Sequence, residues 1–153
     1  MQKLELKIPP VAVFIAMFVV IAKVAQLFPT LGFPLPFGFT VFAICFVCAG
    51  YVGITGIIAF KRAKTTVHPQ KPHETSQMVV KGIYSVTRNP MYLGLFLLLF
   101  GFAYWQQNLL SILLSFGFVL YINRFQIEPE ERALEQRFGQ AFIDYKQSVR
   151  RWI

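Results

Sequence analysis

Four long apolar stretches alternate with polar segments along the chain, and they cover residues 9–28, 37–60, 90–106 and 109–127. The second stretch has no charged side chain, and as a helix rising about 1.5 Å per residue it can cross roughly 30 Å of hydrocarbon. The last two are separated by Gln106-Gln107-Asn108, which predicts a tight turn between antiparallel helices. The pattern predicts an all-α integral membrane protein with about four transmembrane helices.

A polar, helical region is predicted after the last apolar stretch, over residues 129–150. Pro129 suits the first turn of a helix, so we expect a new helix to begin there. Apolar side chains then recur three or four positions apart, at Leu134, Phe138, Phe142, Tyr145 and Val149. This spacing predicts an amphipathic face that lies on the membrane or closes over the loop at residues 61–89, with a break at Gly139.

Composition supports the membrane assignment and gives the chain an orientation. Of the 153 residues, 56% are hydrophobic and 14% are charged, and the mean hydropathy is +0.54, which favours one membrane domain. The 15 Lys and Arg residues exceed the 7 Asp and Glu residues, and none lies in the segments joining the first stretch to the second or the third to the fourth. Since basic loops stay cytoplasmic, we expect both termini in the cytoplasm of a prokaryotic cell, the protein in its inner membrane, and no nucleic-acid partner.

Metal binding is not predicted. Cys45 and Cys48 form a C-x-x-C pattern, but inside an apolar stretch without a third or fourth ligand. His68 and His73 lie in the loop next to prolines and also lack partners. We interpret the cysteines as buried small residues and the histidines as solvated loop residues.

The third apolar stretch begins with a candidate anion site. Asn89 is a residue type that caps helices, and Pro90 suits the first helical position. The unpaired N–H groups and the positive end of the helix dipole favour a carboxylate or phosphate there, and Arg88 adds a full positive charge. The alternative is an ordinary capped helix with Arg88 on a lipid phosphate.

A pair of carboxylates marks the other end of the candidate site. Glu130 and Glu131 follow Pro129 in the first turn of the predicted last helix, where acidic residues are also common for capping reasons. Both candidate sites emerge at the same membrane face, one cationic and one anionic. A zwitterionic ligand would suit this arrangement.

These motifs resemble a known superfamily of integral membrane methyltransferases. The resemblance covers about residues 65–150 and is carried by Gly82-Ile83-Tyr84, Arg88-Asn89-Pro90-Met91-Tyr92-Leu93-Gly94, Glu130-Glu131, Leu134, Phe138-Gly139 and Tyr145. The chain is similar in them to isoprenylcysteine carboxyl methyltransferases and phospholipid methyltransferases. The resemblance implies methyl transfer from S-adenosylmethionine to a membrane lipid or isoprenoid acceptor. It also implies a cofactor pocket formed by cytoplasmic helix ends, the loop and the C-terminal region.

Residue roles follow from the resemblance by position. It implies cofactor contacts at Ser76, Gln77, Met78, Val79, Tyr84, Asn89, Pro90, Met91, Tyr92 and Glu130, to which Arg88 and Glu131 are added for their charges. Asn89 stands where the family usually has His, so a proton-shuttling role is not expected there. Gln126 stands where the eukaryotic carboxyl methyltransferases have a substrate-side Arg. We therefore expect Arg124 and Gln126 at the acceptor, with Arg124 orienting an anionic group.

The acceptor atom decides whether the enzyme needs a base. A carboxylate is already ionised at neutral pH, whereas a protonated amine must first lose a proton. No buried His or Cys is placed for that task, so a carboxylate or similar nucleophile is predicted. The alternatives are phospholipid amine N-methylation, a non-catalytic membrane sensor, and a small transporter. The last would need an acidic residue inside the membrane, and none of the seven acids lies in a predicted span.

Overall fold

The structure is a computed structural model that describes residues 5–63 and 78–153, and within them it is helical without a strand. The main helices are α1 (Pro10–Leu27), α2 (Gly38–Arg62), α3 (Pro90–Trp105), α4 (Leu109–Ile122), α5 (Glu128–Phe138) and α6 (Gln140–Ser148). Two 3₁₀ turns, η2 (Pro29–Leu31) and η4 (Gly82–Ser85), and a π-helical turn, Asn123–Ile127, complete the described elements. The all-helical prediction is confirmed, and each predicted apolar stretch coincides closely with a helix.

Three helices are long and apolar enough to cross a membrane: α1, α2 and the continuous helix Leu109–Phe138. Helix α3 has 16 residues, so it rises only about 24 Å. The continuous helix has 30 residues, or about 45 Å, which exceeds the roughly 30 Å of bilayer hydrocarbon. Its apolar part ends at Ile127, and the charged helix α5 therefore extends beyond the hydrocarbon.

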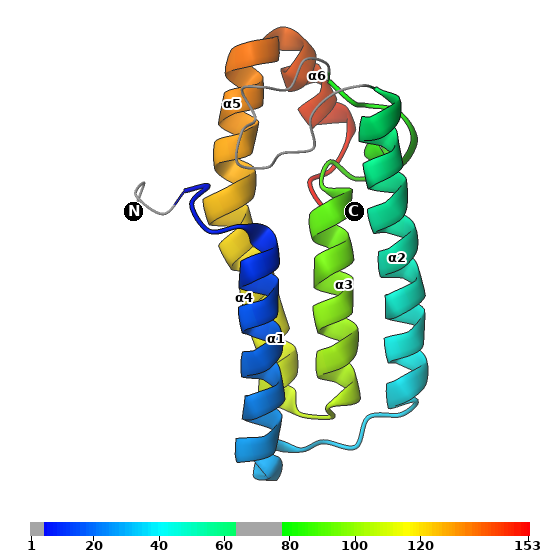
Figure 1. The fold of residues 1–153 in the computed structure, drawn as a ribbon, viewed down its shortest axis with the longest axis vertical. Coiled ribbons are helices and arrows are strands. Elements are labelled where there is room, and N and C mark those ends of the chain that lie inside the picture. The colour runs from blue at the N-terminus through cyan, green and yellow to red at the C-terminus, as the bar shows by residue number, and fades with distance from the viewer. Residues whose placement is uncertain (1–4, 64–77) are drawn as a thin grey trace.

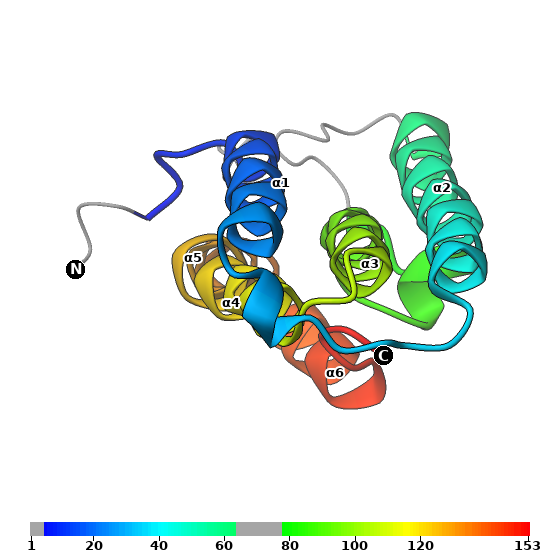
Figure 2. The ribbon, with the colours of Figure 1, turned by 90° about the horizontal axis from the view of Figure 1, so that it is seen from below.

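Helix α3 lies at the centre of the bundle, with α2 on one side and α1 and α4 on the other (Figures 1 and 2). Its buried side chains form the core with residues of the neighbouring helices: Tyr92, Leu99 and Ala103 from α3, Ile21 from α1, and Phe118 and Ile122 from α4. Helix α3 is apolar around its whole circumference, as expected of a helix surrounded by other helices. The predicted turn after α3 is also present, with Asn108 Oδ1 accepting from Ser111 N at 3.1 Å.

Glycines bring α2 and α3 into backbone contact. A Cβ atom at Gly101 would lie 2.6 Å from the Cβ of Cys45, and one at Gly94 would lie 3.1 Å from the carbonyl oxygen of Ala49. At the other end of the contact, a Cβ at Gly56 would lie 3.2 Å from Cγ of Pro90. Small residues allow membrane helices to approach this closely, and here they fix the first turn of α3 against α2.

Pro129 does not begin a new helix, contrary to the sequence prediction. The helix continues from α4 through the π-helical turn into α5. Proline has no N–H and its ring clashes with the carbonyl four residues earlier, and the wider π turn accommodates this. That carbonyl belongs to Phe125 and accepts instead from Leu6 N at 3.0 Å. The N-terminal segment therefore supplies the hydrogen bond that Pro129 cannot make.

The predicted break at Gly139 is present and turns the chain back toward α3. Gly139 has φ +55°, a left-handed value that glycine adopts without strain. Helix α6 then packs toward the segment before α3, where the hydroxyl of Tyr145 donates to the carbonyl oxygen of Tyr84 at 2.6 Å. The C-terminal region was predicted either to lie on the membrane or to close over the loop at residues 61–89. Helix α6 contacts Tyr84 of that loop, as the second alternative predicts.

Candidate functional site

Tyr92 and Glu130 meet where the first turn of α3 faces α5. The Tyr92 hydroxyl donates to Glu130 Oε1 at 2.5 Å, joining residues 38 positions apart in sequence. Burial raises the pKa of the Glu130 carboxyl to about 8, the nearby charge of Glu131 adds to the rise, and the Tyr92 hydrogen bond opposes it. A cation bound beside Glu130 would favour its ionised form. The buried carboxyl group of Glu130 is therefore suited to a cationic partner.

Tyr84 lies close to this pair and is 5% exposed. Its ring packs edge-on against Phe60 of α2, with ring centroids 5.3 Å apart. Burial raises the pKa of the Tyr84 hydroxyl well above its usual range, and the charges of Tyr145 and Glu130 contribute. Burial likewise raises the pKa of Tyr145 to about 12, so both phenols are neutral at physiological pH. Tyr92 thus contacts the Glu130 carboxyl group, and Tyr84 lies near enough to interact with it electrostatically.

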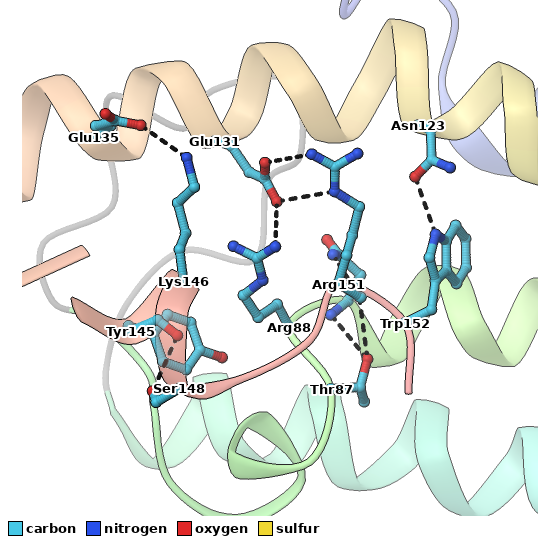
Figure 3. Close-up of polar contacts among 11 residues, drawn as sticks. Thr87, Arg88, Asn123, Glu131, Glu135, Tyr145, Lys146, Ser148, Arg151 and Trp152 are labelled. Carbon is cyan, nitrogen blue, oxygen red and sulfur yellow. Dashed lines mark hydrogen bonds and ion pairs between the residues drawn. The ribbon is translucent and has the colours of Figure 1, made fainter. Parts of the chain in front are cut away.

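Glu131 lies between two arginines, as Figure 3 shows. Arg151 bonds both of its carboxylate oxygens, through Nε at 3.2 Å and Nη2 at 2.7 Å, and Arg88 Nη2 lies 3.2 Å from Oε1. The side chains of Arg88 and Glu131 are each only 11% exposed. Within residues 5–63 and 78–153, Arg88 Nε and Nη1 have no hydrogen-bond partner although they are buried. Buried donors without a partner are costly, so this guanidinium is suited to an additional anion.

Pro90 is the first helical residue of α3, as predicted, but Asn89 does not cap the helix with its side chain. Its Nδ2 donates instead to the carbonyl oxygen of Arg151 at 2.9 Å, and its backbone N–H donates to Thr87 Oγ1 at 3.2 Å. The carbonyl that accepts from the Asn89 side chain belongs to a chain segment more than sixty residues away. The capping prediction was wrong because local sequence does not reveal that partner.

The C-terminal tail, residues 149–153, is a part of this region that the sequence analysis missed. The carbonyl of Arg150 accepts from Arg88 N at 3.1 Å, and the Trp152 indole donates to Asn123 Oδ1 at 3.0 Å. The tail thus connects the start of α3 to both the π-helical turn and α5 (Figure 3). It begins at Val149, the last residue of the amphipathic pattern, so beyond that residue only the charge of its two arginines distinguished it in the sequence.

Arg124 and Gln126, predicted to contact the acceptor, point to the N-terminal segment. Arg124 Nη1 lies 2.9 Å from Glu5 and 3.2 Å from Glu128, and Arg132 also pairs with Glu5. Gln126 is fully buried, and its Nε2 donates to the carbonyl of Ile8 at 2.7 Å. None of these contacts involves the Tyr92–Glu130 pair.

The remaining predicted positions lie around the start of α3 or outside the described residues. Met78 and Val79 lie just before η4 and are partly buried, and Met91 lies in the first turn of α3. Ser76, Gln77, His68 and His73 fall outside the described residues. In the described ranges, no three His, Cys, Asp or Glu side chains gather that could hold a metal ion.

Taken together, one end of the bundle combines a guanidinium with spare donors, a carboxylate with a raised pKa and two buried phenols. A guanidinium binds a carboxylate or phosphate, and a carboxylate binds an ammonium or hydroxyl. Aromatic faces suit a flat base or an onium cation. The arrangement can therefore hold a small zwitterion with an aromatic group.

Comparison with known proteins agrees with the resemblance to membrane methyltransferases. The model of the family described as "Phospholipid methyltransferase" matches residues 38–141. Over 98 residues, or 62% of this chain, the sequence is 30% identical to protein-S-isoprenylcysteine O-methyltransferase B of Arabidopsis thaliana and spans 48% of that protein's length. Over 63 residues, or 41% of this chain, it is 48% identical to an uncharacterized protein of Haemophilus influenzae, whose whole length is covered. No solved structure matches significantly.

Proposed function

Because the chain belongs to the phospholipid methyltransferase family, in the superfamily that includes the isoprenylcysteine methyltransferases, we propose that it transfers a methyl group from S-adenosylmethionine to a lipid-like acceptor. The observation that carries the proposal is the contact between Tyr92 and Glu130, 2.5 Å apart. It brings together two positions that the resemblance assigns to one cofactor. The reaction would take place at the cytoplasmic membrane face.

Each part of the cofactor has a matching group in the site. The free donors of Arg88 suit its carboxylate, and Glu130 suits its ammonium or a ribose hydroxyl. Tyr84 and Tyr92 offer rings for the adenine and the sulfonium. When bound, the cofactor supplies an activated methyl group, and the protein has to orient the acceptor and exclude water. The proposed contacts also include Met78, Val79, Met91 and, outside the described residues, Ser76 and Gln77.

Glu131 has a different part in this proposal. Its carboxylate is occupied by Arg88 and Arg151, so it acts by holding Arg88. Asn89 and Pro90 likewise shape the start of α3, Asn89 through its bond to the tail. We propose that all three determine where the Arg88 donors lie, without needing contact to the cofactor.

The proposed topology has four crossings with both termini cytoplasmic. Support comes from Figure 1, in which the C-terminal end of α2, the start of α3, and helices α5 and α6 lie at one end of the bundle. This end carries Lys61 and Arg62 of α2 and the charged residues of α5. Basic residues collect on the cytoplasmic side, which would place the site there. The short helix α3 would then cross as the central helix, covered by its neighbours.

The acceptor is proposed to be a carboxylate or a similarly ready nucleophile on an apolar molecule. Arg124 would orient such an anion after release from Glu5 or Glu128, and Gln126 would line its path. One observation favours phospholipid amine N-methylation as a second candidate. Because its pKa is near 8, Glu130 would hold its proton at neutral pH and could accept one from an ammonium group at about pH 8 and above, a role for which the sequence offered no His or Cys.

The test uses purified full-length protein in lipid nanodiscs with methyl-labelled S-adenosylmethionine and a total lipid extract. Labelled lipid, identified by mass, supports an enzyme and names the acceptor atom; Glu130→Gln and Tyr92→Phe should lower both cofactor binding and transfer. Binding without transfer would favour a sensor. Absence of cofactor binding by the wild type would refute the proposal, and a transporter would then be the next candidate.

A further inference from the structure

The C-terminal tail supplies a third charged group to a region that needs only two for a neutral pair. Arg151 forms a bidentate pair with Glu131, while Arg88 contacts the same carboxylate with one nitrogen only. In the part of the chain that the structure describes, one carboxylate therefore pairs with two guanidinium groups. The uneven sharing leaves Arg88 Nε and Nη1 without partners among the described residues.

From this uneven sharing we propose that Arg151 is a positioning residue that keeps Arg88 available for the cofactor carboxylate. The inference rests on the proposed function, because it assumes that Arg88 binds that group. Guanidinium and carboxylate groups prefer two parallel hydrogen bonds. With Arg151 absent, both oxygens of Glu131 would be open to Arg88, and the nearest bidentate partner of Arg88 would be Glu131. The donors that now have no partner among the described residues would turn to this internal carboxylate.

The backbone of the tail is held independently of the Arg151 side chain. The carbonyl oxygens of Arg150 and Arg151 accept from Arg88 N and from Asn89 Nδ2, and Trp152 bonds Asn123. The Trp152 ring also packs edge-on against Phe96, with centroids 6.2 Å apart. Removing the guanidinium should therefore leave the tail in place. This separation makes the role of the side chain testable.

The main experiment measures S-adenosylmethionine affinity in full-length protein in nanodiscs, without an acceptor. Arg151→Gln should weaken binding about tenfold, the size expected for losing charge-assisted bonds to the ligand. Arg150→Gln is the matched control: it removes the same charge from an exposed neighbour whose carbonyl, and not its side chain, makes the contact. Its affinity should equal that of the wild type.

The decisive variant is the double substitution Arg151→Gln with Glu131→Gln. A glutamine side chain at position 131 keeps an oxygen that can accept from Arg88 Nη2, so Arg88 stays held, but it offers no second oxygen for a bidentate pair. The double variant should therefore recover most of the affinity lost in the single one. A purely structural role for Arg151 gives no such recovery. Equal affinity of Arg151→Gln and wild type, or an equally weak double variant, would overturn the inference while leaving cofactor binding by the wild type intact.

A second measurement follows the tail without cofactor. The chain has two tryptophans, so Trp105→Phe leaves Trp152 as the only fluorescent indole. In that background, Arg151→Gln should keep the emission maximum unchanged, whereas a red shift would mean that the tail has left and would overturn the inference. If Arg151→Gln does not fold, Arg151→Lys replaces it, because lysine keeps the charge but not the paired donors. This variant should lose about threefold in cofactor affinity, and wild-type affinity would overturn the inference.

Discussion

The two ends of the chain both dock onto the helix formed by α4, the π turn and α5, but they leave different charge balances. At the N-terminal end, Glu5 and Glu128 face Arg124 and Arg132, so two acids meet two cations. At the C-terminal end, among the residues that the structure describes, one acid, Glu131, pairs with Arg88 and Arg151. The first cluster is satisfied by the protein itself. Among the described residues, the second has one more cation than acid, and one of its cations, Arg88, is buried; this imbalance is the basis of the proposed anion site.

Burial sharpens this contrast. The side chains of Arg124 and Arg132 are 35% and 53% exposed. In the second cluster Arg151 is 32% exposed, but Arg88 is only 11% exposed. Exposed ion pairs contribute little because water and salt screen them. Buried charges without full partners are costly, so they are kept where they serve another purpose. Substitutions in the two clusters should therefore have opposite consequences for stability and for binding.

The largest effect is expected from Arg88→Gln. Two charge-assisted hydrogen bonds to the cofactor, at about 1.5 kcal/mol each, correspond to roughly a hundredfold loss of affinity. Stability should hold or rise, because Glu131 keeps its bidentate partner and a buried excess charge is removed. Isothermal titration and thermal unfolding in the same nanodiscs measure both. Unchanged affinity would show that the excess charge has no ligand.

The next effect is a pH dependence that only the C-terminal side should show. Folding raises the pKa of Glu130 from about 4.5 to about 8, so the folded state binds the proton more tightly and stability falls as pH rises between these values. A cationic ligand needs the ionised form, so affinity should rise about tenfold from pH 6 to pH 7, below the range in which an α-ammonium group loses its own proton. The affinity of Glu130→Gln should be weak and nearly independent of pH. A flat wild-type profile would contradict this assignment.

A smaller effect is expected from Tyr92→Phe. The Tyr92 hydrogen bond lowers the pKa of Glu130, so its loss should raise that pKa further and move the affinity profile to higher pH. A loss of a few-fold in affinity at neutral pH is expected, smaller at pH 9. Titrations at both pH values check this, and a loss of equal size at both would mean that the hydroxyl contacts the ligand directly.

The smallest effect is expected from Glu5→Gln in the N-terminal cluster. Its partners are half-exposed, so the free energy of unfolding should fall by about 1 kcal/mol or less. Cofactor affinity should stay at the wild-type value, which makes this variant the counterpart of Arg88→Gln. If affinity fell as it does in Arg88→Gln, the two clusters would have to be treated as one site.

The sequence predicted those features that depend on neighbouring residues. Apolar runs predicted the helices, and Gln106 to Asn108 the turn, because hydrophobicity and local capping determine both. The pairing of Tyr92 with Glu130 was anticipated only through the resemblance, since it joins residues 38 positions apart. Asn89 and Pro129 were misjudged for one reason. The Asn89 side chain bonds the carbonyl of Arg151, and the carbonyl of Phe125, to which Pro129 cannot donate, bonds Leu6 N. Arg151 and Leu6 lie near opposite ends of the chain, so neighbouring residues do not reveal either bond.

The glycine contacts between α2 and α3 also limit how an acceptor can reach Tyr92. The two helices are in close contact from Gly56, which lies against the ring of Pro90, through Gly94, which lies against the backbone of α2, to Gly101, which lies against Cys45. This contact leaves no width for an acyl chain along that seam. A hydrocarbon tail travelling within the leaflet would have to arrive around another flank of the central helix. Because the seam holds α3 against α2, the acceptor and product of the proposed reaction would have to pass on the side of α3 that faces α1 and α4.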